Sequence, residues 1–452
     1  MLQWKNEPEK NSALLIEGAR RIGKTTIVQE FGKNEYSDYL YIDFTYAEKE
    51  LKELFRHVNP SKPEAMNQFF ADLFLLTGKA IKPGDLIIFD EIEFCNAARQ
   101  DIKAFVQDGR FDYIETGSLI SIRENTKDIQ IPSEERRIEM HPLDFEEFCL
   151  AFNEKDKCTL LRNTLNAHSS ISESIHQKQM DDFRLYLALG GMPKVISLYM
   201  ETQSFLRCDK EKKDILKLYE DDLRKHDNLC GTHCLSIYQS MFTSLHSWSQ
   251  ATKTGIKNRA QRALFQRSLK DLEDSKIVNI VRRTSDPAIG DNFPDETKVK
   301  LYPLDTGLML SQLLNEGNDT IEDAYRKIRF GKISGANFGL LYECMVCQSL
   351  VSSGIHPNYH VFKIKEKEKE KQYEIDFTYS KKGKINVLEV KSTNRFEANS
   401  INKITEKYPH LKMRRIIVSP KNLSRQNNIL YLPLYMSFLI GEDNEDEGTT
   451  SE

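Results

Sequence analysis

The chain has 452 residues, of which 39% are hydrophobic and 29% charged, a globular composition long enough for roughly two to four domains. The formal net charge of −4 does not by itself indicate a nucleic-acid partner. The opening segment MLQWKNEPEK lacks the apolar core of a signal peptide, and the apolar run at residues 429–440 is too short to span a membrane and contains Pro433. We therefore expect a cytoplasmic protein with no membrane partner.

Strand-like and helical segments alternate over the first 120 residues. Strands are predicted at residues 13–18, 39–44, 85–92 and 111–118, and helices at 25–33, 51–58, 64–78 and 97–109. Alternation with short connections predicts a parallel sheet covered by helices on both faces, and continuous apolar runs fit strands buried on both faces. Residues 1–150 are predicted to form one α/β domain.

The segment GARRIGKT, residues 18–25, matches the pattern G-x-x-x-x-G-K-[ST] between a predicted strand and a predicted helix. Backbone N–H groups of such a loop and the helix N-terminus attract phosphate. Lys24 is expected to reach the β- and γ-phosphates of ATP, and Thr25 to offer its hydroxyl to Mg²⁺. A vestigial loop is the alternative. The predicted ATP-binding residues are Gly18, Ala19, Arg20, Arg21, Ile22, Gly23, Lys24, Thr25 and Thr26.

Two acids end the apolar segment LIIFDEI, about 65 residues after the loop. Asp90 is expected to hold Mg²⁺, and Glu91 to orient or deprotonate the attacking water. Thr116 and Ser118 end the next predicted strand, where a polar side chain senses the γ-phosphate or only makes a turn. Arg136 and Arg137 are candidates for an arginine finger or for surface positions.

The middle of the chain is predicted to be helical. Residues 151–228 form a helical lid or linker, with a turn at Gly190, Gly191 and Pro193, and residues 229–315 form a winged helix-turn-helix. Residues 253–283 include nine basic residues and three acids, an excess of positive charge that indicates a DNA-binding stretch or a solvated helical face. The segment HDNLCGTHC, residues 226–234, offers zinc ligands but lacks paired C-x-x-C units, which favours buried thiols.

Residues 330–440 are predicted to form a third domain with one long helix and several strands, followed by an acidic disordered tail at 441–452. Asp376 on one strand, with Glu389 and Lys391 on the next, has the order of a PD-(D/E)xK nuclease centre, and Glu343 on the preceding helix is a fourth candidate. A salt bridge between Asp376 and Lys391 at the sheet edge is the alternative.

Several motifs occur in the same order as in a large group of bacterial and archaeal AAA-type ATPases that carry a C-terminal domain of unknown function. They read EGARRIGKTT, FDEIEFC, TGSL, MHPLDFEEF, LGGMPKV, YPLDTGL, YEIDFTY and VLEVKS, and the resemblance extends over about residues 2–437. The resemblance implies an AAA-type P-loop domain, a winged helix and a C-terminal domain that resembles PD-(D/E)xK nucleases. By this resemblance Lys24 and Thr25 bind nucleotide and Asp90 and Glu91 are the Walker B acids. Residues 132–140 depart from the family pattern.

The sequence therefore predicts an ATPase that couples nucleotide state to its C-terminal half, with ATP and Mg²⁺ as cofactors. An ATP-gated, metal-dependent DNA nuclease is one alternative, and a nucleotide-controlled DNA-binding or scaffold protein is another. The candidate macromolecular partners are DNA and a second copy of the chain.

Overall fold

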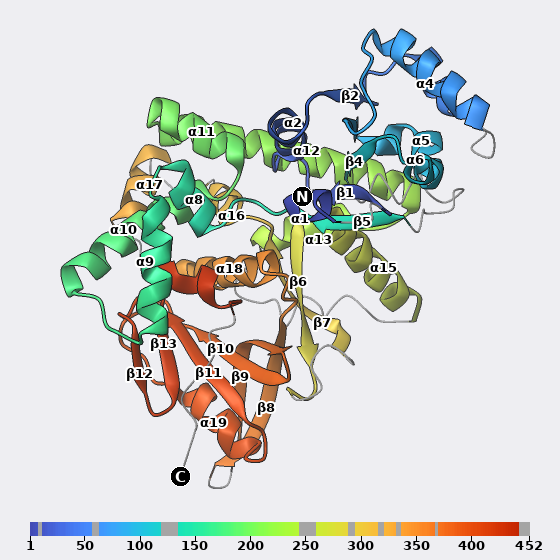
Figure 1. Ribbon diagram of the computed structural model, residues 1–452. Coiled ribbons are helices and arrows are strands. Elements are labelled where there is room, and N and C mark those ends of the chain that lie inside the picture. The colour runs from blue at the N-terminus through green and yellow to red at the C-terminus, as the bar shows by residue number, and fades with distance from the viewer. Residues whose placement is uncertain are drawn as a thin grey trace. The chain divides into compact units, whose positions relative to one another are not determined.

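The structure is a computed structural model that describes residues 1–7, 11–56, 63–118, 134–243, 259–287, 294–314, 321–330, 336–366 and 369–442. These residues belong to two compact units (Figure 1). The first unit comprises residues 1–141 and 274–276, and the second comprises residues 142–273 and 277–452.

The first unit is an α/β fold, as the alternation of segments predicts. Its elements are α1 (Leu2–Lys5), β1 (Ala13–Glu17), α2 (Lys24–Glu35), β2 (Tyr39–Asp43), α3 (Lys49–Arg56), α4 (Pro63–Thr77), β3 (Leu86–Asp90), η1 (Ile92–Phe94), α5 (Asn96–Gln100), α6 (Ile102–Asp108), β4 (Asp112–Gly117) and β5 (Glu135–Glu139). The helix predicted at 97–109 is divided into α5 and α6 at Asp101.

Five parallel strands form the sheet of this unit in the order β2-β3-β4-β1-β5. Strand β4 therefore separates β1, which precedes the glycine-rich loop, from β3, which ends in Asp90. The carboxyl ends of neighbouring parallel strands lie at one edge of a sheet, where open α/β folds bind ligands. This order brings the ends of β1, β4 and β3 together at that edge.

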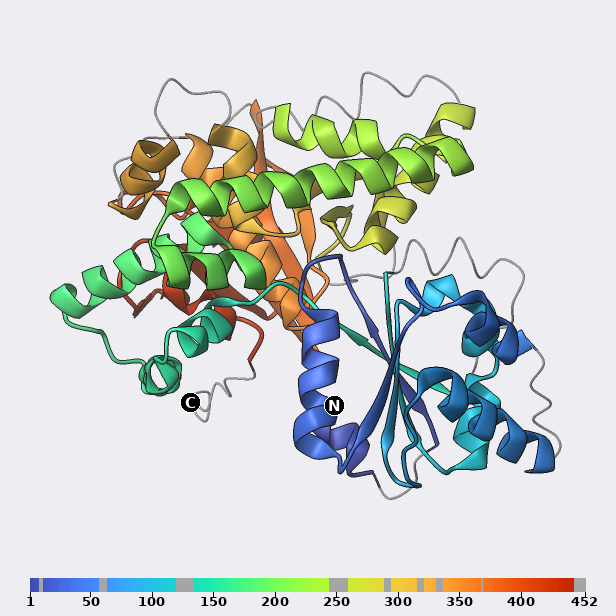
Figure 2. The same cartoon turned by 90° about the horizontal axis from the view of Figure 1, so that it is seen from above.

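Helices cover both faces of the sheet (Figure 2). Val28 and Phe31 of α2 pack with Leu14, Ile16 and other sheet residues on one face. The other face packs against α3 to α6 through a group of aromatic rings that includes Phe55, Phe69, Phe89 and Phe105. The strands are buried on both faces, which explains why they read as continuous apolar runs.

The second unit contains the remaining elements. They are α8 (Phe145–Ala151), α9 (Lys155–Asn166), α10 (Glu173–Leu189), α11 (Pro193–Thr202), α12 (Phe205–Cys230), α13 (Cys234–Thr243), α15 (Arg259–Ser275, which ends in the first unit), β6 (Val278–Thr284), β7 (Pro294–Pro303), α16 (Thr306–Leu314), α17 (Ile321–Arg329), α18 (Ala336–Ser352), β8 (Asn358–Glu366), β9 (Lys369–Lys381), β10 (Lys384–Val390), α19 (Asn399–Lys407), β11 (Met413–Ser419), β12 (Ser424–Gln426), β13 (Ile429–Pro433) and η3 (Leu434–Leu439).

The sheet of the second unit is mixed, with eight strands in the order β12-β13-β11-β10-β9-β8-β6-β7. The pairs β6–β8, β10–β11 and β11–β13 are parallel, and the other neighbours are antiparallel. Ile401 and Ile404 of α19 pack on strand residues such as Ile375 and Val387. The run at 363–371 forms the tip of the β8–β9 hairpin, with residues 367–368 outside the described part.

The predicted winged helix-turn-helix corresponds to α13, α15 and the β6–β7 hairpin, with residues 244–258 outside the described part. The hairpin does not stand alone, because β6 pairs in parallel with β8 and so joins the large sheet. The helix–helix–hairpin order agrees with the prediction, but the winged-helix assignment stays a prediction.

The motifs LGGMPKV and YPLDTGL meet in the second unit. Gly190 ends α10 at φ +79°, and the carboxylate of Asp305 lies where its Cβ would be, with Oδ1 at 2.2 Å from that position. Asp305 accepts hydrogen bonds from the N–H groups of Gly191 at 2.6 Å and Leu308 at 2.9 Å. These motifs therefore join α10 to the start of α16, and their glycines allow the two segments to pack closely.

No helix within the described ranges is long and apolar enough to cross a membrane. The apolar run at 429–440 instead forms β13 and η3, whose residues are almost all buried.

Candidate functional site

The loop between β1 and α2 depends on two glycines. Gly18 has φ +153°, and a Cβ there would lie 2.5 Å from the carbonyl oxygen of Met140, so that no larger residue fits. Gly23 has φ +96° and directly precedes the first residue of α2. Arg21 also adopts a left-handed conformation, at φ +69°. The loop thus wraps closely around the N-terminus of α2, as a phosphate-binding loop requires.

Lys24 is turned into this loop. Its ammonium donates to the carbonyl oxygens of Gly18 at 3.0 Å and Ala19 at 2.9 Å, and the residue is buried. Burial lowers the pKa of Lys24, although Glu91, Glu93 and Asp90 oppose this shift. A buried ammonium held only by loop carbonyls is suited to accept a phosphate as a stronger partner.

Asp90 lies at the centre of a group of hydroxyls. It accepts hydrogen bonds at Oδ2 from Tyr41 at 2.6 Å and from Thr25 at 2.9 Å. Thr116 of β4 donates to its other oxygen, Oδ1. Burial, together with the bond to Asp90, raises the pKa of Tyr41. The carboxylate of Asp90 and the hydroxyl of Thr25 are hard oxygen ligands, a donor set that fits Mg²⁺.

The two acids after β3 form a second group with Ser118. Glu91 adopts a left-handed conformation at φ +51°, unusual for a residue with a long side chain, and its N–H donates to Thr116 Oγ1 at 3.2 Å. Glu93 accepts from the hydroxyl of Ser118 at 3.1 Å and hydrogen-bonds with Glu91. Burial, reinforced by the charge of Glu91, raises the pKa of Glu93 to about 8. The raised pKa favours the protonated form of the Glu93 carboxyl in this site.

Glu93, like Tyr41, is a site residue that the sequence motifs did not indicate. The only signal for it is a second acid two positions after Glu91, which is too common to be specific. Glu93 also borders an open pocket beside α3 and the β3–α5 connection. The pocket is lined by Lys52, Arg56, Glu93, Phe94, Cys95, Asn96 and Ala97.

Arg136 and Arg137, the arginine-finger candidates, both lie on the edge strand β5. Arg136 pairs with Glu7. Arg137 pairs with Glu17 at 3.4 Å and with Glu135 at 3.5 Å. Both arginines therefore contribute to ion pairs at the edge of their own sheet.

The C-terminal candidates are linked by a lysine that the sequence analysis did not consider. Lys300 of β7 lies 2.7 Å from Glu374, 3.5 Å from Glu343 and 3.6 Å from Asp376. Burial alone would lower the pKa of Lys300, but the three acids raise it above its usual value. Glu343 also accepts a hydrogen bond from the hydroxyl of Tyr302 at 2.7 Å.

The strand residues of this predicted nuclease-like centre lie beside a β-bulge, where β9 has one more residue than β8 between the pairs 358–378 and 360–375. Asp376 accepts from the N–H of Val390 at 2.8 Å, and Glu389 pairs with Lys391 at 3.2 Å. The alternative pairing of Asp376 with Lys391 is thus replaced by one with Lys300. Burial raises the pKa of Glu389, against the effect of Lys391.

The single ammonium of Lys300 lies among Glu343, Glu374 and Asp376 and offsets part of their negative charge. Among the described residues, Glu343, Asp376 and Glu389 are not gathered into a group whose ligand atoms all lie within 4.8 Å of one another.

The basic stretch at 253–283 is only partly described. Lys253 and Lys257 lie outside the described residues, and Arg282 pairs with Glu273 at 2.7 Å. Part of the predicted positive charge is therefore neutralised within the unit.

The parallel five-stranded sheet, the wrapped loop and the acids after β3 are together consistent with a P-loop nucleotide-binding domain. Residues 10–149 match the family model of an AAA domain. Two further segments, residues 180–319 and 338–436, match models of domains of unknown function, DUF8612 and DUF4143. Comparison with curated proteins found no match.

The AAA match supports an AAA-type P-loop ATPase in the N-terminal part of the chain, in agreement with the resemblance drawn from the motifs. The other two matches carry no assigned activity, so that the nuclease-like and winged-helix predictions stay open.

Proposed function

We propose that the first unit binds ATP with Mg²⁺ and hydrolyses it. The arrangement around Asp90 carries this proposal, because it holds a buried carboxylate, the hydroxyl of Thr25 and the sensor candidate Thr116 within one hydrogen-bonded group. Lys24, the first residue of α2, donates to the carbonyl oxygens of Gly18 and Ala19 in the loop before it. These are the residue types that a P-loop ATPase places around the phosphates.

In this proposal each side chain has one task. Lys24 leaves the carbonyls of Gly18 and Ala19 to bind the terminal phosphates, while Thr25 and Asp90 hold Mg²⁺. Mg²⁺, when bound, supplies positive charge that stabilises the transferring phosphoryl group. Glu91 accepts the proton of the attacking water, and Glu93 positions Glu91 through their shared hydrogen bond.

Glu91→Gln tests the hydrolytic step. This change removes the base but keeps the shape of the side chain, so we expect kcat for ATP hydrolysis to fall by about 10²–10⁴-fold while ATP still binds. Steady-state phosphate release and ATP binding are measured on the same preparations. Glu30→Gln, the same change on the exposed side of α2, is the control and should hydrolyse ATP as the wild type does. Unchanged kcat in Glu91→Gln would contradict the assigned role.

We further propose that nucleotide state is coupled to the second unit, and that the nuclease-like centre is inactive while Lys300 lies among its acids. The ion pairs of Lys300 with Glu343, Glu374 and Asp376 support this proposal, because the lysine takes the place of a cation. A DNA-binding or scaffold role is then favoured over constitutive cleavage. DNA binding that weakens steeply with salt supports this role, whereas binding that is absent or insensitive to salt contradicts it.

A further inference from the structure

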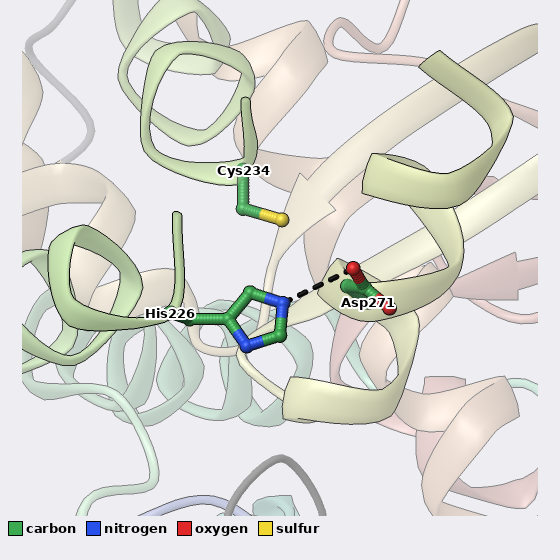
Figure 3. Close-up of side chains that lie close together, drawn as sticks. All are labelled: His226, Cys234 and Asp271. Carbon is green, nitrogen blue, oxygen red and sulfur yellow. Dashed lines mark hydrogen bonds and ion pairs between the residues drawn. The ribbon is translucent and has the colours of Figure 1, made fainter. Parts of the chain in front are cut away.

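Three side chains of types that can bind a metal lie close together in the second unit. His226 of α12, Cys234 at the start of α13 and Asp271 of α15 each present one ligand atom, and these atoms lie within 4.8 Å of one another (Figure 3). The sequence pointed to His226, Cys230, His233 and Cys234 as a weak zinc candidate. In the structure His226 and Cys234 lie together. The third side chain of the group is Asp271, 37 residues after Cys234, and not Cys230 or His233.

The turn between α12 and α13 is held in place by one carboxylate. Asp227 Oδ1 accepts from the Thr232 hydroxyl at 2.7 Å and from the Cys234 N–H at 2.9 Å, and Oδ2 accepts from the Leu235 N–H at 2.9 Å. Gly231, at φ +65°, allows the chain to reverse. This network fixes Cys234 against α12, and the Cys234 thiol itself donates to the hydroxyl of Thr232 at 3.5 Å.

Helix α15 is fixed to the same turn. The hydroxyl of Ser268 accepts from the N–H of His233 at 3.0 Å, and the thiol of Cys234 lies 3.4 Å from the carbonyl oxygen of Ser268. Asp271 follows Ser268 by about one helical turn, on the same side of α15. These contacts hold the turn that carries Cys234 against the part of α15 that carries Asp271.

The positions of Asp271 and Cys234 around the ring of His226 fit a metal chelate better than a catalytic triad. In a triad the acid and the nucleophile use opposite nitrogens of the histidine. Here Asp271 binds Nε2 of His226 at 3.0 Å, and Figure 3 shows the sulfur of Cys234 on the same side of the ring.

We propose that His226, Cys234 and Asp271 bind a divalent transition-metal ion of the zinc class. The donors are an imidazole nitrogen, a sulfur and a carboxylate oxygen, the set that zinc prefers. On binding, the metal replaces the hydrogen bond between His226 and Asp271, the neutral imidazole carries its proton on Nδ1 in place of Nε2, and the thiol releases its proton to solvent. The Asp271 side chain is 22% exposed, so that water can complete the coordination. The metal joins α12, α13 and α15.

Cobalt titration of the chelator-treated full-length protein tests the proposal. One equivalent of Co²⁺ should produce the near-ultraviolet charge-transfer band of a thiolate ligand, and Zn²⁺ should abolish it. The candidate Mg²⁺ site, Thr25 and Asp90, contains no thiol, so metal bound there gives no such band. Zn²⁺ should also raise the melting temperature.

Variants identify the ligands. Cys234→Ser should lose the band, and His226→Gln and Asp271→Asn should weaken Co²⁺ binding at least about tenfold. Asp271→Asn lies at a partly exposed position, so it remains informative if a change at a buried ligand prevents folding. Cys230→Ser, a half-buried thiol at the end of α12, is the control and should bind as the wild type does. A wild type without the band, a band that persists in Cys234→Ser, or its loss in Cys230→Ser would overturn the proposal.

Discussion

Glu93 carries a proton that depends on the folded state. The pKa of its carboxyl is 4.5 in its ordinary setting and about 8 beside Glu91 in the buried site. A raised pKa means that folding takes up a proton between these two values. The contribution to stability is therefore complete below about pH 4.5 and is lost as the pH rises through 8.

The free energy of unfolding of the wild-type first unit should fall between pH 5.5 and pH 7.5. We predict that it falls less steeply in Glu93→Gln than in the wild type, by at most about 1.4 kcal/mol per pH unit. Other buried acids with raised pKa values, such as Glu115, are present in both proteins and cancel in the difference. Urea unfolding followed by the fluorescence of Trp4, which is buried in this unit, measures the effect.

Trp248, the other tryptophan, lies outside the described residues and is replaced by Phe in both proteins. Glutamine keeps an oxygen that can accept from Ser118, so that the variant tests the proton and not the shape. Parallel pH profiles for the two proteins would show that Glu93 is not protonated in the fold.

Among single residues, the sequence predicted those that belong to a motif with fixed spacing. Lys24, Thr25 and Asp90 follow from the spacing of the loop and the first acid, and the structure places Thr25 against Asp90. The sequence could not predict Tyr41, which comes from another strand and reaches Asp90 only through the sheet register. Lys300 was missed for the same reason, because its partners lie on other elements of the second unit.

Among the elements, the junction of α10 with α16 depends on a glycine without space for a side chain. We predict that Gly190→Ala destabilises the second unit by about 3 kcal/mol, because a Cβ strains the backbone and displaces Asp305 from two N–H groups. Chemical denaturation followed by far-ultraviolet circular dichroism measures the loss.

Gly354→Ala shows the cost of a positive φ where the missing Cβ meets open space. Gly354 also has a positive φ, +74°, but nothing lies within 4 Å of its missing Cβ. Its substitution should cost only about 1 kcal/mol, the penalty for a left-handed residue. If the two substitutions cost the same, the carboxylate of Asp305 contributes nothing.

The long apolar strands and amphipathic helices were predictable, but the edge of the first sheet was not. Strand β5 reads ERRIE, and four of its five side chains are charged. Charged residues keep an edge strand from pairing with other chains, and the side chain of Glu135 is buried in an ion pair with Arg99. Such a strand has no apolar run. The bulge beside Asp376 was hidden for a related reason, since an extra residue in β9 changes register without changing composition.

For the whole molecule, the question is whether the second unit can bind a catalytic metal. We predict that Lys300→Ala increases Mn²⁺ affinity there at least tenfold, because three acids lose their internal cation. Calorimetry on an Asp90→Asn background, with Cys234→Ser to remove the thiol ligand, restricts the measurement to this site. DNA cleavage in the presence of Mn²⁺ is followed in parallel.

Lys298→Ala removes the same charge from the same strand and should leave Mn²⁺ binding unchanged. Asp376→Ala in the Lys300→Ala protein should abolish any gain in binding or cleavage. Equal Mn²⁺ affinity in the wild type and in Lys300→Ala would contradict the view that the lysine occupies the position of a cation.

The most direct test of the central claim is ATP binding to the full-length protein in the presence of Mg²⁺, measured by calorimetry on the wild type, Lys24→Ala and Lys33→Ala. Lys33 lies on the same helix and is exposed, so its variant controls for the loss of charge. The account predicts stoichiometric binding by the wild type and Lys33→Ala, and affinity at least about a hundredfold weaker for Lys24→Ala. A wild type that binds no ATP, or a Lys24→Ala protein that binds it normally, would contradict the account.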